Sequence, residues 1–187
     1  MSNGRVIVAK GGRSLEREIS LKTSHECEEA LRELDYDVTP VDVDHTFVSK
    51  ISALKPNFVF IAMHGKGGED GTMQELLETL GVPYTCADPL ASEICMDKIL
   101  FKRLLRRAGL PTPPFCALEA RAFNEFGAGE VLPHAVEELG LPLVLKPAGE
   151  GSAQGIKFVD KEDELTSALI GVFAYDDRAL LEAHIEG

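Results

Sequence analysis

The sequence lacks any apolar run of the roughly 18 residues that a transmembrane helix needs. Its first residues, MSNGRVIVAKGG, contain only a strand-length apolar run, which is too short for the core of a signal peptide. The four cysteines form no CxxC pair, and no histidine lies at zinc-finger spacing from them. We find no internal repeat and no low-complexity tract. These absences predict a cytoplasmic protein whose cysteines are reduced thiols.

Basic side chains are also scarce, with 19 Lys and Arg against 31 Asp and Glu and a net charge of -12. Nucleic acid and anionic membrane surfaces both attract a net basic face, so we expect neither as a partner. A local basic pocket for phosphates is still compatible with this charge. The length of 187 residues and the hydrophobic fraction of 44% fit a globular chain of one or two domains.

The first half of the chain alternates between strand and helix patterns. Apolar runs predict strands at 5–9, 37–43 and 57–63, and helices are predicted at 20–34 and about 72–80. Such alternation is typical of a parallel sheet with crossover helices. The proline in the second run favours an edge strand. The predicted buried face of the first helix consists of Leu21, Ser24, Cys27, Ala30, Leu31 and Leu34.

An amphipathic helix is predicted at 97–108, with Asp97 as its N-cap and Gly109 just beyond its end. Its apolar stripe consists of Leu100, Phe101, Leu104, Leu105 and Ala108. The following GLPTPPF segment stops the helix, and we expect a domain boundary nearby.

The remaining sequence predicts a smaller α+β unit. We expect helices at 133–139 and 161–171, a hairpin of strands at 141–146 and 155–159, and a strand at 178–184. These elements are few for an independent core. Because the sequence stops directly after an apolar strand, we expect a fragment of a longer protein, with a naturally short chain as the alternative.

Three glycine-rich segments are candidates for binding. The first, GGRSLERE, follows the first strand and carries Glu16 and Glu18. Its plain alternative is a strand-to-helix turn with Ser14 or Ser20 as the cap. The second, MHGKGGEDGT, follows a buried strand and carries His64, which could bond a substrate or merely cap the sheet.

The third segment, LKPAGEGSAQGIKF, places Lys146 before a loop with several glycines and Ser152. Such a loop can direct backbone N–H groups at phosphate oxygens, although the order is not that of a Walker A loop. A flexible hairpin turn is the alternative. Lys98 opens the following domain and could be a surface charge. Glu182 interrupts an apolar strand, as either a carboxylate beside a nucleotide sugar or a solvated edge residue.

These motifs together, in this order, resemble the D-alanine–D-alanine ligase family of the ATP-grasp superfamily. The most specific are HGKGGEDGT and KPAGEGS, and the likeness covers nearly the whole chain. The resemblance implies that ATP phosphorylates the carboxylate of one D-alanine to an acyl phosphate. The amine of a second D-alanine then attacks, and the dipeptide serves peptidoglycan synthesis.

The resemblance also implies roles for individual residues. Glu16 corresponds to the carboxylate that holds the ammonium of the first D-alanine, and His64 to a histidine near its reacting end. Ser152 corresponds to the serine that links the phosphate loop, the substrate and Glu16. The implied ATP contacts are Lys98, Lys146, Glu150, Gly151, Ser152, Ala153, Glu182, Ala183 and Ile185. Ala153 departs from the second serine of many relatives, and His184 from an aromatic residue.

The implied organisation is a Rossmann-like substrate and dimerisation domain at 1–95, followed by the first part of an ATP-grasp domain at 96–187. The resemblance implies a homodimer, ATP as cofactor and Mg²⁺ bound by family residues beyond this sequence, so we expect no metal ligand here and little turnover from this chain alone. A D-Ala–D-Lac or D-Ala–D-Ser ligase is the nearest alternative. A non-catalytic nucleotide-binding or dimerisation module is another.

Overall fold

The computed structural model describes residues 2–186, and the chain divides into two compact units, Met1–Glu93 and Ile94–Gly187. Helix α4 (Pro89–Met96) contains the point of division. Each unit has its own sheet and its own buried core.

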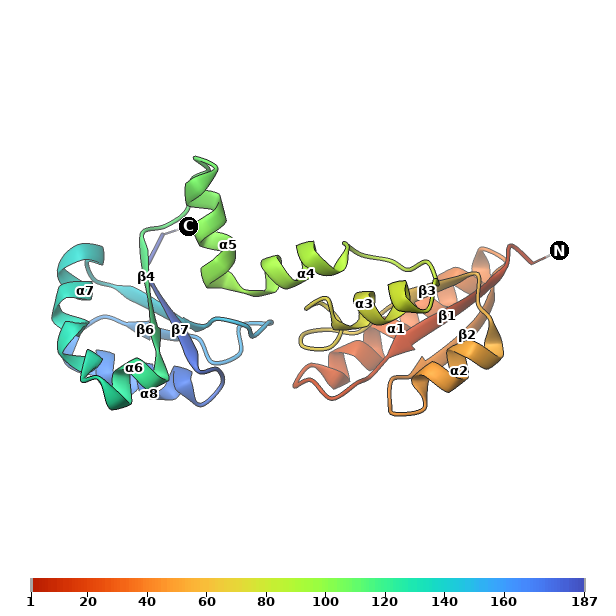
Figure 1. Ribbon diagram of the computed structural model, residues 1–187, viewed down its shortest axis with the longest axis horizontal. Helices are drawn as coiled ribbons and strands as arrows, with labels where there is room; N and C mark the ends of the chain where they lie inside the picture. The colour runs from red at the N-terminus through yellow and green to blue at the C-terminus, as the bar shows by residue number, and fades with distance from the viewer. Residues whose placement is uncertain (1, 187) are drawn as a thin grey trace. The chain divides into compact units, whose positions relative to one another are not determined.

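The N-terminal unit is built on a parallel sheet, as the alternation of elements predicted (Figure 1). Its three strands are ordered β2-β1-β3. The strands are β1 (Arg5–Lys10), β2 (Asp37–Asp42) and β3 (Phe58–Ile61), and the helices are α1 (Arg17–Glu33), α2 (Phe47–Leu54) and α3 (Thr72–Thr79). The strand β2 lies at an edge, which confirms the interpretation of its proline.

Helices cover both faces of this sheet. One face of β1 packs with α2 and α3 in a core that includes Ile7, Phe47 and Leu77. Because side chains alternate along a strand, Val6 and Val8 face the other way, toward α1, and are also buried. Burial on both faces explains why the strands appear as continuous apolar runs.

The buried face of α1 agrees with the predicted one at Ser24 and otherwise differs from it. Its buried residues are Ser20, Ser24 and Glu28, whereas Leu34 is exposed. The Glu28 carboxylate accepts a hydrogen bond from Lys10 Nζ at 2.9 Å, at the end of β1. A polar stripe is therefore buried because the sheet supplies its partners.

The C-terminal unit contains an antiparallel sheet with strands in the order β4-β7-β5-β6. The strands are β4 (Phe115–Glu119), β5 (Leu143–Pro147), β6 (Lys157–Val159) and β7 (Arg178–Ala183); the helices are α5 (Lys98–Arg107), α6 (Ala120–Glu125), α7 (Leu132–Leu139) and α8 (Leu165–Phe173). Short 3₁₀ turns occupy Ala128–Val131 and Glu162–Glu164. The predicted hairpin of β5 and β6 is confirmed.

The two faces of this sheet have different covers (Figure 1). Helices α6, α7 and α8 pack over the main core, which includes Leu145, Leu169 and Leu181. On the other face, Ile99 of α5 packs with Phe115 and neighbouring apolar residues. The nucleotide-site candidate Glu182 contacts Lys102 of α5 directly, and Lys146 of β5 bonds the same carboxylate.

The predicted apolar stripe of α5 is wrong. Leu100, Phe101 and Leu104 remain 37–39% exposed, while the buried residues of the helix are Ile99 and Lys102. The predicted ends of the helix are confirmed, because Asp97 accepts a hydrogen bond from Leu100 N at 2.9 Å and Gly109 has a φ of 72°.

Sequence patterns missed α2, α4, α6 and β4, which are short or lie among prolines. All four cysteines are free. None of the helices formed by the described residues has both the length and the apolar character needed to cross a lipid bilayer.

Candidate functional site

In the N-terminal unit, two glycine-rich loops follow β1 and β3 at the same edge of the parallel sheet. Ser20 ties them together: its hydroxyl accepts a hydrogen bond from Gly11 N at 2.8 Å and donates to the Ala62 carbonyl at 2.7 Å. The carboxyl ends of parallel strands are the usual position for a ligand. The two loops therefore form one surface at the expected place.

Glu16 lies between these loops and is only 5% exposed. A Cβ atom at Gly65 would come within 2.9 Å of Glu16 Oε1, and Gly65 has a φ of 67°. The loop after β3 therefore needs glycine at this position for two reasons. Glu16 occupies the N-cap position of α1 and makes no capping hydrogen bond through its side chain, while Ser14 Oγ accepts from Glu16 N, so of the two predicted caps Ser14 lies at the helix start and Ser20 lies inside the helix.

His64 belongs to the same cluster. Its carbonyl accepts a hydrogen bond from the Ser14 hydroxyl at 2.7 Å, and Ser14 Oγ also accepts from Glu16 N at 3.2 Å. The ring contacts Thr23 Oγ1 through Nε2 at 3.0 Å and Glu69 Oε1 through Nδ1 at 3.4 Å. The structure thus brings Glu16 and His64 together, and it adds Thr23 and Glu69 as partners that sequence patterns did not indicate.

In the C-terminal unit, the glycine-rich loop between β5 and β6 is anchored at both ends. Asp176 accepts a hydrogen bond from Gly149 N at 2.8 Å through one oxygen and from Arg178 N at 2.9 Å through the other. At the far end, a Cβ atom at Gly155 would come within 2.7 Å of the Tyr175 ring. The loop therefore rests on the segment that leads into β7.

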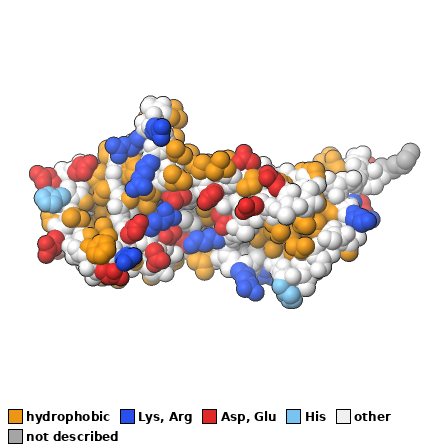
Figure 2. Space-filling model, in the orientation of Figure 1, with side chains coloured by type: hydrophobic (Ala, Val, Ile, Leu, Met, Phe, Trp, Pro, Cys, Tyr) orange, Lys and Arg blue, Asp and Glu red, His pale blue; other side chains and the backbone are white. Residues whose placement is uncertain are grey.

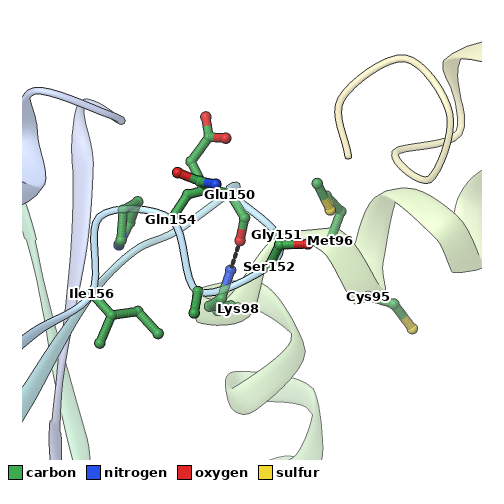
Figure 3. A pocket seen from close by; sticks show the side chains of 10 residues that line it. Cys95, Met96, Lys98, Glu150, Gly151, Ser152, Gln154 and Ile156 are labelled. Atoms are coloured by element: carbon green, nitrogen blue, oxygen red, sulfur yellow. Dashed lines mark hydrogen bonds between the residues drawn. The ribbon is translucent and has the colours of Figure 1, made fainter. Parts of the chain in front are cut away.

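Lys98 stands beside this loop, at the start of α5. Its ammonium donates to the Glu150 carbonyl and lies 3.5 Å from that of Ala148 (Figure 3). Burial and the nearby charge of Lys146 hold the pKa of Lys98 below its ordinary value. Lys98 and the loop line a cavity of about 240 Å³ together with Met96. The interpretation of Lys98 as a plain surface charge is therefore wrong.

The backbone of this loop adopts an uncommon conformation. Ser152 and Ala153 have φ values of 44° and 59°, in the left-handed region that favours glycine. A turn of this kind leaves backbone N–H groups directed to one side, which suits an anion. Ser152 belongs to the C-terminal unit, and its predicted link to Glu16 stays a prediction.

Lys146 and Glu182 line a second cavity, of about 380 Å³. Its other walls are mostly apolar and come from Pro113, Val144, Ile156, Phe158, Ala183, His184 and Ile185. An apolar slot with a few polar groups is typical of sites for small flat molecules. The edge of the His184 ring meets Phe158, with ring centroids 5.9 Å apart.

Ala183 lines this second cavity and lies opposite Pro114 where the pairing of β7 with β4 ends. Ala183 N donates to the Pro114 carbonyl at 3.0 Å. In an antiparallel pair of this kind the partner normally returns a hydrogen bond, but proline has no N–H. The proline-rich segment before β4 therefore supplies no backbone bond to the Ala183 carbonyl, which fits its expected contact with adenine.

Glu182 is buried in the central strand β7, so the alternative of a solvated edge residue is wrong. Burial alone would raise the pKa of its carboxyl, but hydrogen bonds from Lys102 and Lys146 lower it. Lys102 Nζ lies 2.7 Å from Glu182 Oε2, and Lys146 Nζ bonds the other oxygen. Sequence analysis missed Lys102, although its position four residues after Lys98 places both lysines on the same side of α5.

The surface around α5 is basic, although the whole chain is acidic (Figure 2). Helix α5 carries Lys98, Lys102, Arg103, Arg106 and Arg107. A local basic region therefore exists in spite of the negative net charge of the chain. Among residues 2–186, no three His, Cys, Asp or Glu side chains gather so as to hold a metal ion. No contact of Mg²⁺ is therefore assigned to the described residues.

Two family models match the chain. The model for the D-ala D-ala ligase N-terminus matches residues 45–87, and that for the D-ala D-ala ligase C-terminus matches residues 104–187. The D-alanine–D-alanine ligases of Moorella thermoacetica and Aquifex aeolicus are 43% and 41% identical to this chain over 183 residues. Each alignment covers 98% of this chain and 59% or 60% of the relative.

Solved structures of the same family are also similar to this chain. The D-alanine–D-alanine ligase of Bacillus anthracis has a TM-score of 0.83 at 37% identity, and its complex with ATP has a TM-score of 0.82 at 36% identity. These alignments cover 98% of this chain and 58% or 60% of the solved chains. The present chain thus spans about three fifths of the length of the curated relatives it matches. With its parallel and antiparallel sheets and its matches at both ends, the chain belongs to the D-alanine–D-alanine ligase family, whose fold is ATP-grasp.

Proposed function

We propose that this protein is an ATP-dependent ligase that joins two D-alanine molecules. The observation that carries the proposal is the arrangement of Lys98, Lys146 and Glu182 around the glycine-rich loop and its two cavities. It offers cations and N–H groups for phosphates beside an apolar slot for adenine. The solved complex of a relative with ATP supports the same assignment.

In the proposed reaction, a carboxylate oxygen of the first D-alanine attacks the γ-phosphorus of ATP, and ADP leaves. The free amine of the second D-alanine then attacks the acyl carbon. The C–O bond to the phosphate breaks, inorganic phosphate leaves with its electron pair, and the amine nitrogen loses a proton as the peptide bond forms. Lys98, Lys146 and the loop N–H groups would stabilise negative charge on the transferred phosphoryl group. Glu16 would hold the ammonium of the first D-alanine, with His64 near its carboxylate.

We assign the adenine contacts to residues that line the second cavity. The Ala183 carbonyl would accept from the exocyclic amine, the Ile185 N–H would donate to a ring nitrogen, and Glu182 would accept a further hydrogen bond. In the first cavity, the backbone of Glu150, Gly151, Ser152 and Ala153 would surround the phosphates. The Ser152 hydroxyl would contact the phosphoryl group or the substrate.

The test is phosphate release and dipeptide formation by the native enzyme with ATP. We expect both products to depend on D-alanine and to be absent with L-alanine, since the site must hold one stereoisomer. Release of phosphate without dipeptide, or no nucleotide binding, would contradict the proposal. Binding of ATP without any turnover would favour the non-catalytic module instead.

The same assay can measure the specificity for the second substrate. D-Lactate or D-serine in place of the second D-alanine would give a depsipeptide or a mixed dipeptide, and competition between them measures the preference. From the resemblance we further propose a role in peptidoglycan synthesis, a cytoplasmic location and a homodimer. Sedimentation of the native enzyme as a monomer at micromolar concentration would contradict the dimer.

A further inference from the structure

Glu182 has two cationic partners that differ in their surroundings. Lys102 lies on α5 and Lys146 on the neighbouring strand β5, and each ammonium bonds a different oxygen of the carboxylate. The side chain of Lys102 is 8% exposed, whereas that of Lys146 is 27% exposed. One buried carboxylate is therefore shared between a deeply buried cation and a more accessible one.

Lys102 is held in place by more than the carboxylate. Its ammonium also donates to Thr112 Oγ1 at 2.8 Å, and it lies 5.0 Å from the centroid of the Phe115 ring. A cation over an aromatic face gains further electrostatic stabilisation. These contacts leave Lys102 no open path to a ligand, and it lines neither of the two cavities.

Lys146 has the opposite character. It lines the larger cavity, while Lys98 lines the smaller one beside the glycine-rich loop, and the charge of Lys146 contributes to the lowered pKa of Lys98. An anion bound beside the glycine-rich loop would attract both. Because both anions draw on the same ammonium, a closer approach to the bound anion would weaken the bond of Lys146 to Glu182.

Such a movement is costly if it leaves a buried carboxylate without a cation. Glu182 is 7% exposed, and water cannot replace the lost partner well. With Lys102 fixed on the other oxygen, the carboxylate keeps one cation throughout. The penalty for moving Lys146 is thereby reduced.

We propose that Lys102 is a positioning residue that serves as the permanent counter-ion of Glu182 and so frees Lys146 to exchange this carboxylate for a phosphate oxygen. The inference rests on the proposed nucleotide-binding function. It assigns a role to a lysine that would itself touch neither ATP nor D-alanine.

The experiment measures binding of ATP and of inorganic tripolyphosphate to the native enzyme by calorimetry. Tripolyphosphate isolates the anion contacts from those to adenine. We expect Lys102→Met to weaken both probes by at least about tenfold, because Lys146 then remains bound to Glu182. Lys102→Arg keeps the charge and should restore affinity to within about threefold of the wild type.

Arg106→Met is the matched control. Arg106 also lies over the Phe115 ring, at 5.4 Å, but it makes no ion pair with Glu182 among the contacts of the described residues. Loss of its charge should change tripolyphosphate affinity by less than about threefold, the effect of one screened surface charge. An effect equal to that of Lys102→Met would mean that only the net charge matters, and would overturn the inference.

The decisive comparison removes the carboxylate. In the Glu182→Gln background no carboxylate retains Lys146, so adding Lys102→Met should leave tripolyphosphate affinity unchanged. A loss of about tenfold in that background, or no loss from Lys102→Met alone, would overturn the inference. If Lys102→Met does not fold, the pair in the Glu182→Gln background can still overturn the inference, through a loss of about tenfold there. A wild type that binds neither probe overturns the proposed function as well, whereas normal wild-type binding confines a failure to Lys102.

Discussion

Replacing Glu182 by glutamine tests whether the charged cluster of Lys102, Lys146 and Glu182 stabilises the fold. The substitution keeps the size of the side chain and one acceptor oxygen, but it removes the negative charge. Lys102 and Lys146 then face each other across a neutral amide. The destabilisation should come mainly from Lys102, because its side chain is 8% exposed.

Removing one partner of a buried ion pair typically costs about 3–5 kcal/mol. We expect the lower end, about 3 kcal/mol, because Lys146 can turn toward solvent and the amide still accepts a hydrogen bond. For a domain of this size, about 1 kcal/mol lowers Tm by roughly 4–8 °C. Glu182→Gln should therefore lower the Tm of the C-terminal unit by roughly 12–24 °C.

The assay is thermal unfolding at several pH values, and its signature is a difference in Tm whose size depends on pH. The folded-state pKa of Glu182 lies below its ordinary value of 4.5, so its stabilising contribution is fully present above that pH. The contribution is lost as the pH falls through the lowered pKa. The difference in Tm between wild type and Glu182→Gln should thus be largest near pH 7 and shrink below about pH 4.5.

Glu119→Gln is the control, since Glu119 is exposed on β4 of the same sheet. It should change stability by less than about 0.5 kcal/mol. A Tm for Glu182→Gln within 2–3 °C of wild type, or roughly equal effects of the two variants at every pH, would refute the argument from burial.

Three further substitutions test the proposed roles. Lys146→Ala should weaken ATP binding by roughly 10- to 100-fold and change D-alanine saturation little, and the reverse pattern in steady-state kinetics would show that the roles are misassigned. Glu16→Gln should raise the apparent constant for the first D-alanine by at least about tenfold at saturating ATP, whereas a lower Tm with unchanged kinetics would leave Glu16 as structure. Asp97→Ala removes both the cap of α5 and the ion pair with Arg178 at 2.6 Å, so thermal unfolding should show a loss of about 1–2 kcal/mol, and an unchanged Tm would contradict this.

Apolar runs and turn residues predicted most of the strands and the ends of α5, because these depend on local sequence. The same patterns failed for the buried faces of α1 and α5. In both helices a charged residue is buried, Glu28 in α1 and Lys102 in α5. Their partners, Lys10 and Glu182, lie 18 and 80 residues away. A periodicity argument assigns charged residues to solvent and cannot see a distant counter-charge.

The candidate site also combines residues that the sequence indicates with residues that only the fold reveals. Glu16, His64, Lys146 and Glu182 stand out in the sequence because their residue types are unusual beside glycines or in apolar strands, whereas Lys98 was indicated only by the family resemblance. Side chains that hold these residues in place carry no such local signal. Asp176 and Thr23 become recognisable only from contacts across the fold, and the spacing of Lys102 from Lys98 does not by itself indicate its bond to Glu182.

The anchors of the glycine-rich loop limit how far it can travel. Gly149 is tied to Asp176, the Glu150 carbonyl is bonded by Lys98, and Gly155 packs against Tyr175, so the span between these anchors is residues 151–154. A fully extended chain gains at most about 3.5 Å per residue, so the apex of such an arc stays within about 10 Å of its two supports. The length of the loop between its anchors thus sets the largest distance that its apex can move. Lengthening it by insertion would alter how tightly it can close on a phosphate, even with every contacting residue retained.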